Sequence, residues 1–199
     1  MTIGTTGLVA VILAGGQSRR MGGGDKGLLR LGAGTVLSAV LGRIAPQVGA
    51  VAINANGDPA RFRDYGLPVL TDNMPGYPGP LAGILAAVDW ALGQGAKWVL
   101  TVPSDTPFVP RDLAARLDAA VQGQAVAIAA TGDRIHPACG LWTVELRGDL
   151  AATLARDERK VRDFTDRHGA ALVSWPSGPP DPFFNINTPA DLAQAQGWL

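Results

Sequence analysis

Short apolar runs alternate with helical patterns along the chain, and this alternation constrains the fold more than any other feature of the sequence. Each run is bounded by Gly, Pro or Asp, and the segments between the runs place apolar residues at helical spacing. Strands separated by helices indicate a parallel sheet, because parallel neighbours need a crossover connection. The sequence therefore predicts an α/β fold, a single-domain three-layer α/β/α structure with a mostly parallel, Rossmann-like sheet, spanning residues 1–199.

The same patterns place the individual elements. Strands are predicted at 8–14, 50–54, 68–71, 98–102, 125–130, 138–143 and 170–174. Helices are predicted after Thr35 and at 59–65, 81–94, 110–121, 146–156, 160–168 and 189–196. Thr35 and Thr188 are the expected N-caps, because a threonine hydroxyl accepts a hydrogen bond from the first helical turn. Pro189, at the first helical position, strengthens the second of these starts.

The first predicted strand leads directly into a loop rich in glycine and cations, Leu13 to Lys26. The stretch contains five glycines and three cations. Glycine lets the backbone approach a ligand closely, so that N–H groups donate to phosphate oxygens, and Arg or Lys supplies the countercharge. Only three of the 17 basic residues are lysine, and the compact ammonium of Lys26 suits a charge that follows a phosphate through a reaction. The loop is predicted to hold a nucleotide, although single loop cations are usually only solvated.

Two better-known glycine motifs do not describe this loop. Gly22-x-Gly24-x-x-Gly27 has the spacing of a dinucleotide fingerprint, but seven residues separate Ala14 from Gly22 and no acidic residue occurs between Gly27 and Gly57. A P-loop needs Ser or Thr after its lysine, whereas Gly27 follows Lys26. The loop therefore indicates a less common kind of nucleotide site.

Polar residues follow three further predicted strands, at the edge where open parallel sheets bind ligands. Asn54 and Asp72 could hydrogen-bond a base or a ribose, although turn formation is the commoner role for such residues. Asp105 follows the expected central strand 98–102. One aspartate with substrate phosphate oxygens can hold Mg²⁺, so Asp105 is the candidate metal ligand. An Asx-turn before Thr106 explains Asp105 about equally well, and both interpretations stay open.

Composition narrows the classes of function. The formal net charge is zero, which argues against a broad nucleic-acid or membrane-surface footprint. The apolar run 8–14 is too short to cross a membrane and no basic segment precedes it, so no signal peptide is predicted and a cytoplasmic location is expected. The single cysteine, Cys139, rules out an internal disulfide and, with two histidines, makes a Cys/His zinc site improbable. Cys139 lies in an apolar run and is expected to be buried rather than to act as a nucleophile with His136.

Five motifs, in order along the chain, resemble one family of nucleotidyltransferases. Leu13 to Lys26 is similar to the Leu-x-Gly-Gly-x-x-x-Arg-Met-Gly loop of the nucleotide-sugar pyrophosphorylase superfamily. The closer resemblance, nearly end to end, is to the molybdenum cofactor guanylyltransferases. Its further motifs are Asn54-Ala55-Asn56, Tyr77 to Gly83, Asp105-Thr106-Pro107 and Asn185-x-Asn187-Thr188-Pro189. One departure is Gly24, where the family often has a larger residue.

The resemblance implies transfer of GMP from GTP to the phosphate of molybdopterin, with release of pyrophosphate and with Mg²⁺ as cofactor. Asp105 would hold the metal, and Lys26 and Arg19 would help to neutralise charge on the pyrophosphate. Acceptor molybdoenzymes or other cofactor-synthesis proteins are the partners that the family implies. The GTP contacts that the resemblance implies are Leu13, Ala14, Gly15, Gly16, Lys26, Asn54, Asp72 and Asp105. The candidates for the pterin side are Gly79, Gly83, Asn185 and Asn187.

Other classes of function remain open at this point. One is a cytidylyltransferase acting on the same pterin or a pyrophosphorylase acting on a sugar phosphate, and nucleotide preference separates these enzymes from a guanylyltransferase. Another is a non-catalytic module that binds a nucleotide or cofactor and hands it to a partner protein. Loss of Asp105 or Lys26 would favour such a module, and both residues are present.

Overall fold

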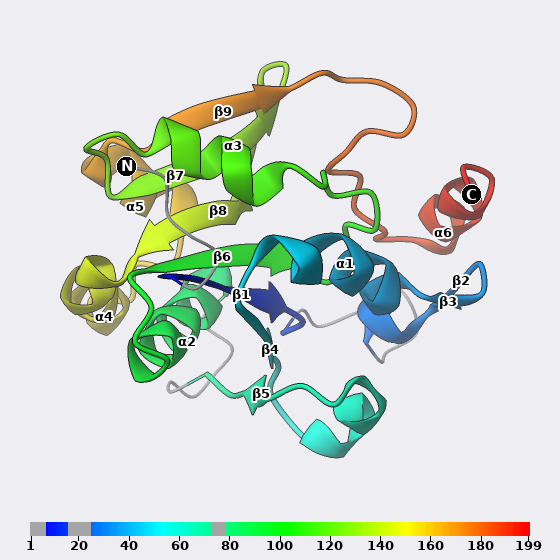
Figure 1. Cartoon of the computed structure of the whole chain (residues 1–199), viewed down its shortest axis with the longest axis horizontal. Helices are drawn as coiled ribbons and strands as arrows, with labels where there is room; N and C mark the ends of the chain where they lie inside the picture. Colours follow the sequence, from blue (N-terminus) through cyan, green and yellow to red (C-terminus); the bar gives the residue numbers. More distant parts are fainter. Residues whose placement is uncertain (1–6, 16–24, 73–78) are drawn as a thin grey trace.

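The centre of the molecule is a seven-stranded sheet with helices on both faces (Figure 1). The computed structural model describes residues 7–15, 25–72 and 79–199. The strands of the sheet are β1 (Leu8–Leu13), β4 (Ala50–Asn54), β5 (Val69–Leu70), β6 (Trp98–Pro103), β7 (Val126–Thr131), β8 (Arg134–Thr143) and β9 (Ala171–Trp175). The α-helices are α1 (Val36–Ile44), α2 (Pro80–Gly93), α3 (Leu113–Ala120), α4 (Arg147–Ala155), α5 (Val161–His168) and α6 (Pro189–Gln196).

The strands follow the order β5-β4-β1-β6-β8-β7-β9. β8 pairs antiparallel with both β6 and β7. The pairs β1–β4, β1–β6, β4–β5 and β7–β9 are all parallel. The predicted α/β fold with a mostly parallel sheet is therefore confirmed.

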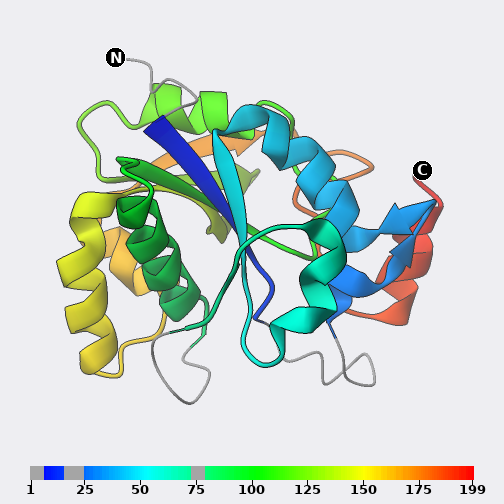
Figure 2. The same ribbon diagram turned by 60° about the horizontal axis from the view of Figure 1, so that its bottom comes forward.

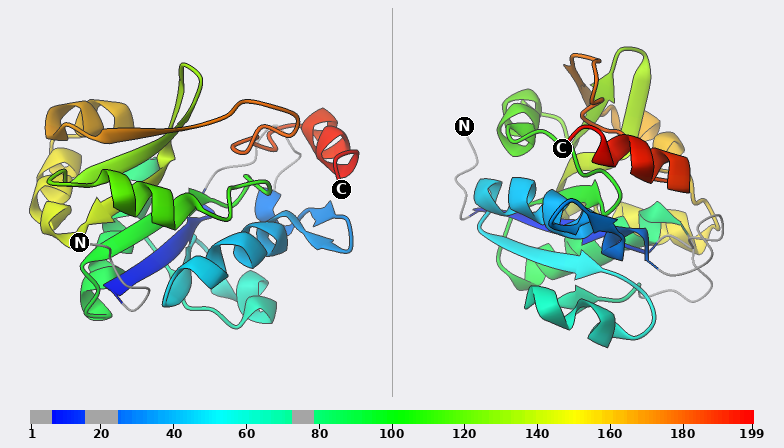
Figure 3. Two further views of the ribbon diagram at one scale, coloured as in Figure 1. Left: turned by 45° about the horizontal axis from the view of Figure 1, so that its top comes forward. Right: turned by 90° about the vertical axis from the view of Figure 1, so that its right-hand side faces the viewer.

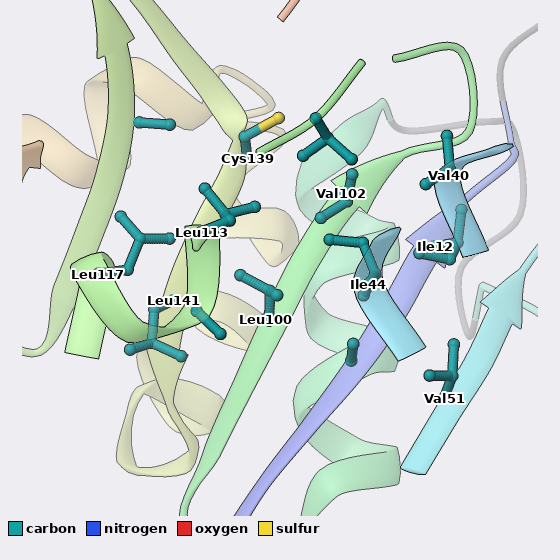
Figure 4. Packing of buried hydrophobic residues seen from close by; sticks show 14 of the residues in the cluster. Ile12, Val40, Ile44, Val51, Leu100, Val102, Leu113, Leu117, Cys139 and Leu141 are labelled. Carbon is teal, nitrogen blue, oxygen red and sulfur yellow. The ribbon is translucent and has the colours of Figure 1, made fainter. Parts of the chain in front are cut away.

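Strand β1 shows how the sequence builds the layers. Leu8, Ala10 and Ile12 face the core that α1 and α3 cover, whereas Val9 and Val11 face the core under α2, α4 and α5. Successive side chains of a strand point to opposite faces, so a strand buried on both faces must be a continuous apolar run. Figure 4 shows the first of these cores, and Figure 2 shows α2, α4 and α5 grouped on one side of the sheet with α1 on the other.

The two predicted helix starts are confirmed. At Thr35 the hydroxyl accepts from the Ser38 amide at 3.0 Å, and the Ser38 hydroxyl accepts from the Thr35 amide at 2.8 Å. Thr188 and Asp191 make the equivalent pair of bonds at the start of α6. Each reciprocal pair satisfies backbone donors that a helix leaves free at its N-terminus.

The connection between β7 and β8 differs from the prediction. A turn at residues 132–133 joins the two strands, and β8 begins at Arg134 rather than at residue 138. Pairing shifts from Ile128 opposite Gly140 to Ala129 opposite His136, so residues 137–139 bulge from the ladder. Because proline cannot donate to a ladder, Pro137 suits a bulge inside a strand, and the predicted strand wrongly began after it.

Smaller differences concern short elements. Residues 59–65, predicted as a helix, form a 3₁₀ helix, η5 (Pro59–Tyr65). The predicted helix at 110–121 begins only at Leu113. The hairpin of β2 (Arg30–Leu31) and β3 (Gly34–Thr35) was not predicted, because two-residue strands leave no periodic pattern.

Helix α6 packs away from the main layers, beside the β2–β3 hairpin (Figures 1 and 3). A small core joins them, formed by Leu31, Val36, Phe108, Ile186 and Ala195. This packing brings the segment before α6 back across the end of β6. In the part of the chain that the structure describes, no helix combines the length and apolar character needed to span a membrane.

His136, at the edge of the β8 bulge, is 8% exposed. Its Nε2 lies 2.8 Å from the Thr131 hydroxyl, and its ring stacks on Phe183 with centroids 4.5 Å apart. Burial and, to a smaller extent, the charge of Arg134 lower the pKa of His136 from 6.5 to about 4, against an opposing effect of Asp181. The folded protein therefore holds this imidazole neutral at pH values where an unfolded chain would protonate it.

We expect this histidine to make stability fall as pH falls. Between pH 6.5 and 4 the unfolded state binds the proton more readily than the folded state, so acid favours unfolding, with a cost of about 2 to 3 kcal/mol at pH 4. Urea unfolding of the wild type and of His136→Gln across this range measures the effect, since carboxylate titrations cancel in the difference. Parallel stability curves for the two proteins would contradict the expectation.

Candidate active site

Four strand ends meet along one edge of the sheet and carry predicted site residues. The order β5-β4-β1-β6 places Asp72, Asn54, Gly15 and Asp105 at neighbouring strand ends. Backbone bonds continue past the strands, from the Ala14 amide to the Asn54 carbonyl at 2.8 Å and from the Ser104 amide to the Leu13 carbonyl at 3.0 Å. The backbone at this edge is therefore held in place, as a ligand site on an open α/β sheet requires.

Lys26 and Asp105 form the first cluster at this edge. Lys26 Nζ lies 3.5 Å from Asp105 Oδ2 and donates to Asn187 Oδ1 at 2.5 Å. Asn185 Nδ2 donates to Asp105 Oδ1 at 2.9 Å. The Lys26 and Asp105 side chains are 20% and 18% exposed. The structure thus holds a cation and a carboxylate in fixed positions that a ligand can still reach.

The segment before α6 holds the two asparagines in place. The Ile186 amide donates to the Asp105 carbonyl at 2.9 Å, and Asp191 Oδ2 accepts from the amides of Asn187 and Thr188 at 2.9 and 2.8 Å. Burial acts to raise the pKa of Asp191, but these hydrogen bonds and the nearby charge of Lys26 hold it below its usual value. The lowered pKa favours the charged form of Asp191, which accepts the hydrogen bond that fixes the backbone of Asn187.

A second cluster of amides surrounds Asp72. Asn54 Nδ2 donates to Asp72 Oδ1 at 3.0 Å, and Asn56 Nδ2 donates to Asp72 Oδ2 at 2.7 Å. Asn56 Oδ1 accepts from the Asp72 amide at 2.9 Å. Asn54 is only 3% exposed, so this arrangement is rigid. A carboxylate held in this way presents its remaining lone pairs to donors such as the N–H groups of a base or the hydroxyls of a ribose.

Gly83, on the first turns of α2, packs directly against Asn54. A Cβ at this position would lie 2.5 Å from Asn54 Oδ1 and 3.1 Å from Leu13 Cδ2. The first distance is far below van der Waals contact, so any larger residue must displace the Asn54 amide. Glycine is therefore required here by close approach.

We expect Gly83→Ala to weaken nucleotide binding by about tenfold, because the displaced Asn54 amide no longer holds Asp72. Gly93→Ala is the matched control, since it lies on the same helix and a Cβ there would meet nothing within 4 Å. The control should keep its affinity and gain up to about 1 kcal/mol of stability. Nucleotide titration of both variants measures the difference, and equal affinities would show that Gly83 does not support the nucleotide-binding cluster.

The donor set at Asp105 suits a divalent ion that is also bound by substrate. Within residues 7–15, 25–72 and 79–199, no three His, Cys, Asp or Glu side chains gather in a way that could hold a metal. One carboxylate with substrate phosphate oxygens and water is a common arrangement for Mg²⁺. Asp105, whose Oδ2 faces the ammonium of Lys26, is the residue that would hold such an ion.

The structure brings most of the predicted site residues together, while their roles stay predictions. Asn185 and Asn187, predicted for the pterin side, contact Asp105 and Lys26 instead of standing apart from them. Gly79 is the N-cap of α2, at a φ of 85° that favours glycine. Gly16 and Arg19 lie outside the described residues.

Cys139 is buried, as expected, and burial raises the pKa of its thiol well above the usual range, with Asp105 adding to the effect. The thiol therefore stays protonated.

Asp191 and Arg61 contact the site without having been predicted as part of it. The sequence predicted the start of α6 from Thr188 and Pro189, but no motif marked Arg61.

The fold, with its two clusters at the strand ends, is that of a nucleotidyltransferase. The sequence model of the family described as MobA-like NTP transferase domain matches residues 10–172. A molybdenum cofactor guanylyltransferase from Rhodopseudomonas palustris (strain HaA2) is 53% identical, over 94% of this chain and 90% of the relative. One from Cereibacter sphaeroides is 52% identical, over 96% and 97%. The chain therefore belongs to the MobA-like NTP transferase family, in the group of the molybdenum cofactor guanylyltransferases, and the resemblance seen in the sequence is confirmed.

The solved structures agree at the level of the fold. Molybdopterin-guanine dinucleotide biosynthesis protein A from Archaeoglobus fulgidus superposes with a TM-score of 0.75 at 24% identity, over 96% of this chain and 97% of that one. Membership of the nucleotidyltransferase family suggests the use of a divalent metal ion, which the single carboxylate at Asp105 suits.

Proposed function

We propose that the chain transfers GMP from GTP to the phosphate of molybdopterin and releases pyrophosphate, with residues 1–199 acting as one nucleotidyltransferase domain. The observation that carries this proposal is the Lys26–Asp105 pair, placed beside the Asn54–Asp72 cluster on one sheet edge. The names of the relatives at about half identity supply the nucleotide and the acceptor.

The two clusters suit the two ends of a nucleotide. Asn54 and Asp72 would hydrogen-bond the base or the ribose, and the bond between their side chains supports this proposal. Lys26 would exchange its contact with Asp105 for a phosphate oxygen and so stabilise charge that develops on the pyrophosphate. The proposed Mg²⁺, held by Asp105 and phosphate oxygens, would offset further negative charge there.

The reaction needs no nucleophile from the protein, because the pterin phosphate itself attacks the α-phosphate. The protein has to align the two phosphates and hold charge near them. Gly79, Gly83, Asn185 and Asn187 remain our candidates for the pterin side. We place the reaction in the cytoplasm, with acceptor molybdoenzymes or cofactor-synthesis proteins as the proposed recipients of the product.

Nucleotide selectivity tests this function before any turnover assay is needed. Isothermal titration with GTP, CTP, ATP and UTP, each with and without Mg²⁺, should show selective binding of GTP that tightens with the metal. Selectivity for CTP would move the activity to cytidylyl transfer. Absence of binding to every nucleotide, also after addition of molybdopterin, would contradict the nucleotidyltransferase proposal.

A further inference from the structure

Arg61, on η5, contacts three residues that lie in two segments of the chain. Its Nε donates to Asp25 Oδ2, its Nη1 to the Asp58 carbonyl, and its Nη2 to the Asn56 carbonyl at 2.6 Å. The guanidinium also lies over the ring of Phe62, 4.6 Å from its centroid. All three nitrogens of one side chain are therefore engaged.

These two segments carry the two clusters of the site. Asp25 directly precedes Lys26, whose ammonium contacts Asn187 and faces Asp105. Asn56, on the other segment, pairs with Asp72 through both ends of its amide. Arg61 is thus a short bridge between the lysine end and the aspartate–amide end of the edge.

The bridge is rigid for physical reasons. The Arg61 and Asp25 side chains are 26% and 15% exposed, so water screens their attraction less than at an open surface. Phe62 is 1% exposed and fixes the plane on which the guanidinium rests. A planar fork of donors holds its partners in one geometry, which the flexible ammonium of lysine does not do.

We infer that Arg61 is a positioning residue, which sets the distance between the phosphate-binding Lys26 and the base- or ribose-binding Asp72 cluster. The inference rests on the proposed function for the identity of the nucleotide. A ligand that spans both clusters gains affinity from their fixed separation, whereas a ligand that occupies one cluster does not. Loss of Arg61 should therefore harm the binding of the whole nucleotide more than the binding of its parts.

The experiment compares GTP with its two halves, GMP and pyrophosphate. Arg61→Ala should weaken the binding of GTP about tenfold, while the affinity for GMP or for pyrophosphate changes less than about twofold. The kcat/KM for GTP should fall at least tenfold as well. Arg61→Lys should recover only part of the loss. Asp25→Asn tests the same link from its other side and should lower GTP affinity in the same direction.

Arg63→Ala is the matched control, because Arg63 lies on the same 3₁₀ helix with an exposed side chain and its loss removes the same charge. We expect this control to bind all three ligands like the wild type. Parallel weakening of GTP, GMP and pyrophosphate in Arg61→Ala would show a purely structural role and overturn the inference. Unchanged GTP affinity in Arg61→Ala and Asp25→Asn would overturn it as well.

Failure of the proposed function would look different. The wild type would then bind no GTP or would prefer another nucleotide. Failure of the positioning role shows only in the Arg61 and Asp25 variants, while the wild type binds GTP normally. Should Arg61→Ala not fold, Arg61→Lys and Asp25→Asn carry the same comparison.

Discussion

Asp105→Asn should lower turnover by about 10²- to 10³-fold while leaving the fold intact. The substitution keeps the shape of the side chain and removes its charge. Asp105 accepts from Asn185 through one oxygen and faces Lys26 through the other. An amide can still bond to Asn185, but it presents no anion to a divalent ion or to the lysine. The loss should therefore fall on the chemical step, and higher metal concentrations should be needed for the remaining activity.

Steady-state GMP transfer at several metal concentrations measures this effect, with thermal unfolding as the check on folding. Asp133→Asn is the control, because Asp133 lies exposed in the β7–β8 turn and its substitution removes the same charge. A folded Asp105→Asn protein with near-normal turnover would exclude Asp105 from the mechanism.

Lys26→Ala should lower turnover by about 10²-fold, the second largest effect we expect. Lys26 Nζ bonds to Asn187 and faces Asp105, so its loss removes the one cation that the described residues place beside that carboxylate at 3.5 Å. Lys26→Arg should restore little activity, because a planar guanidinium does not fit the space of a compact ammonium.

Lys97→Ala provides the comparison, since Lys97 is exposed just before β6, at the opposite end of that strand from Asp105. Measuring kcat and KM for both substrates separates the two possible roles of Lys26. A rise in KM for GTP with kcat unchanged would mean that Lys26 binds GTP equally in the ground state and the transition state and does not assist the chemical step. Normal kcat and KM would contradict both roles.

Much of the fold follows from local pattern. β1, β4 and β6 are largely apolar runs, because both faces of the sheet are covered and most of their side chains are buried. The direction of β8 could not be predicted, since an apolar run does not tell parallel from antiparallel pairing. The 137–139 bulge made this harder by placing a proline within a strand.

The site was predictable where it depends on strand ends. Asn54, Asp72 and Asp105 follow strands, and parallel neighbours carry such residues to one edge. The contacts of Asn185 and Asn187 depend on how α6 packs after a long loop, which no local pattern encodes. Their bonds to Asp105 and Lys26 link residues 80 and 161 positions apart.

Arg61 shows the limit of reading residues one at a time. It lies in a short polar segment where arginine is usually a solvated surface residue. Its bond to Asp25 joins residues 36 positions apart, so only the folded structure reveals it.

Transfer of labelled GMP tests the proposed function most directly. The purified chain is incubated with molybdopterin, Mg²⁺ and GTP labelled at the α-phosphate, and CTP replaces GTP in a parallel reaction. We expect the label to move to the pterin from GTP, with one pyrophosphate released per transfer and little reaction from CTP. Transfer from CTP alone, or pyrophosphate release without labelled pterin, would contradict guanylyl transfer.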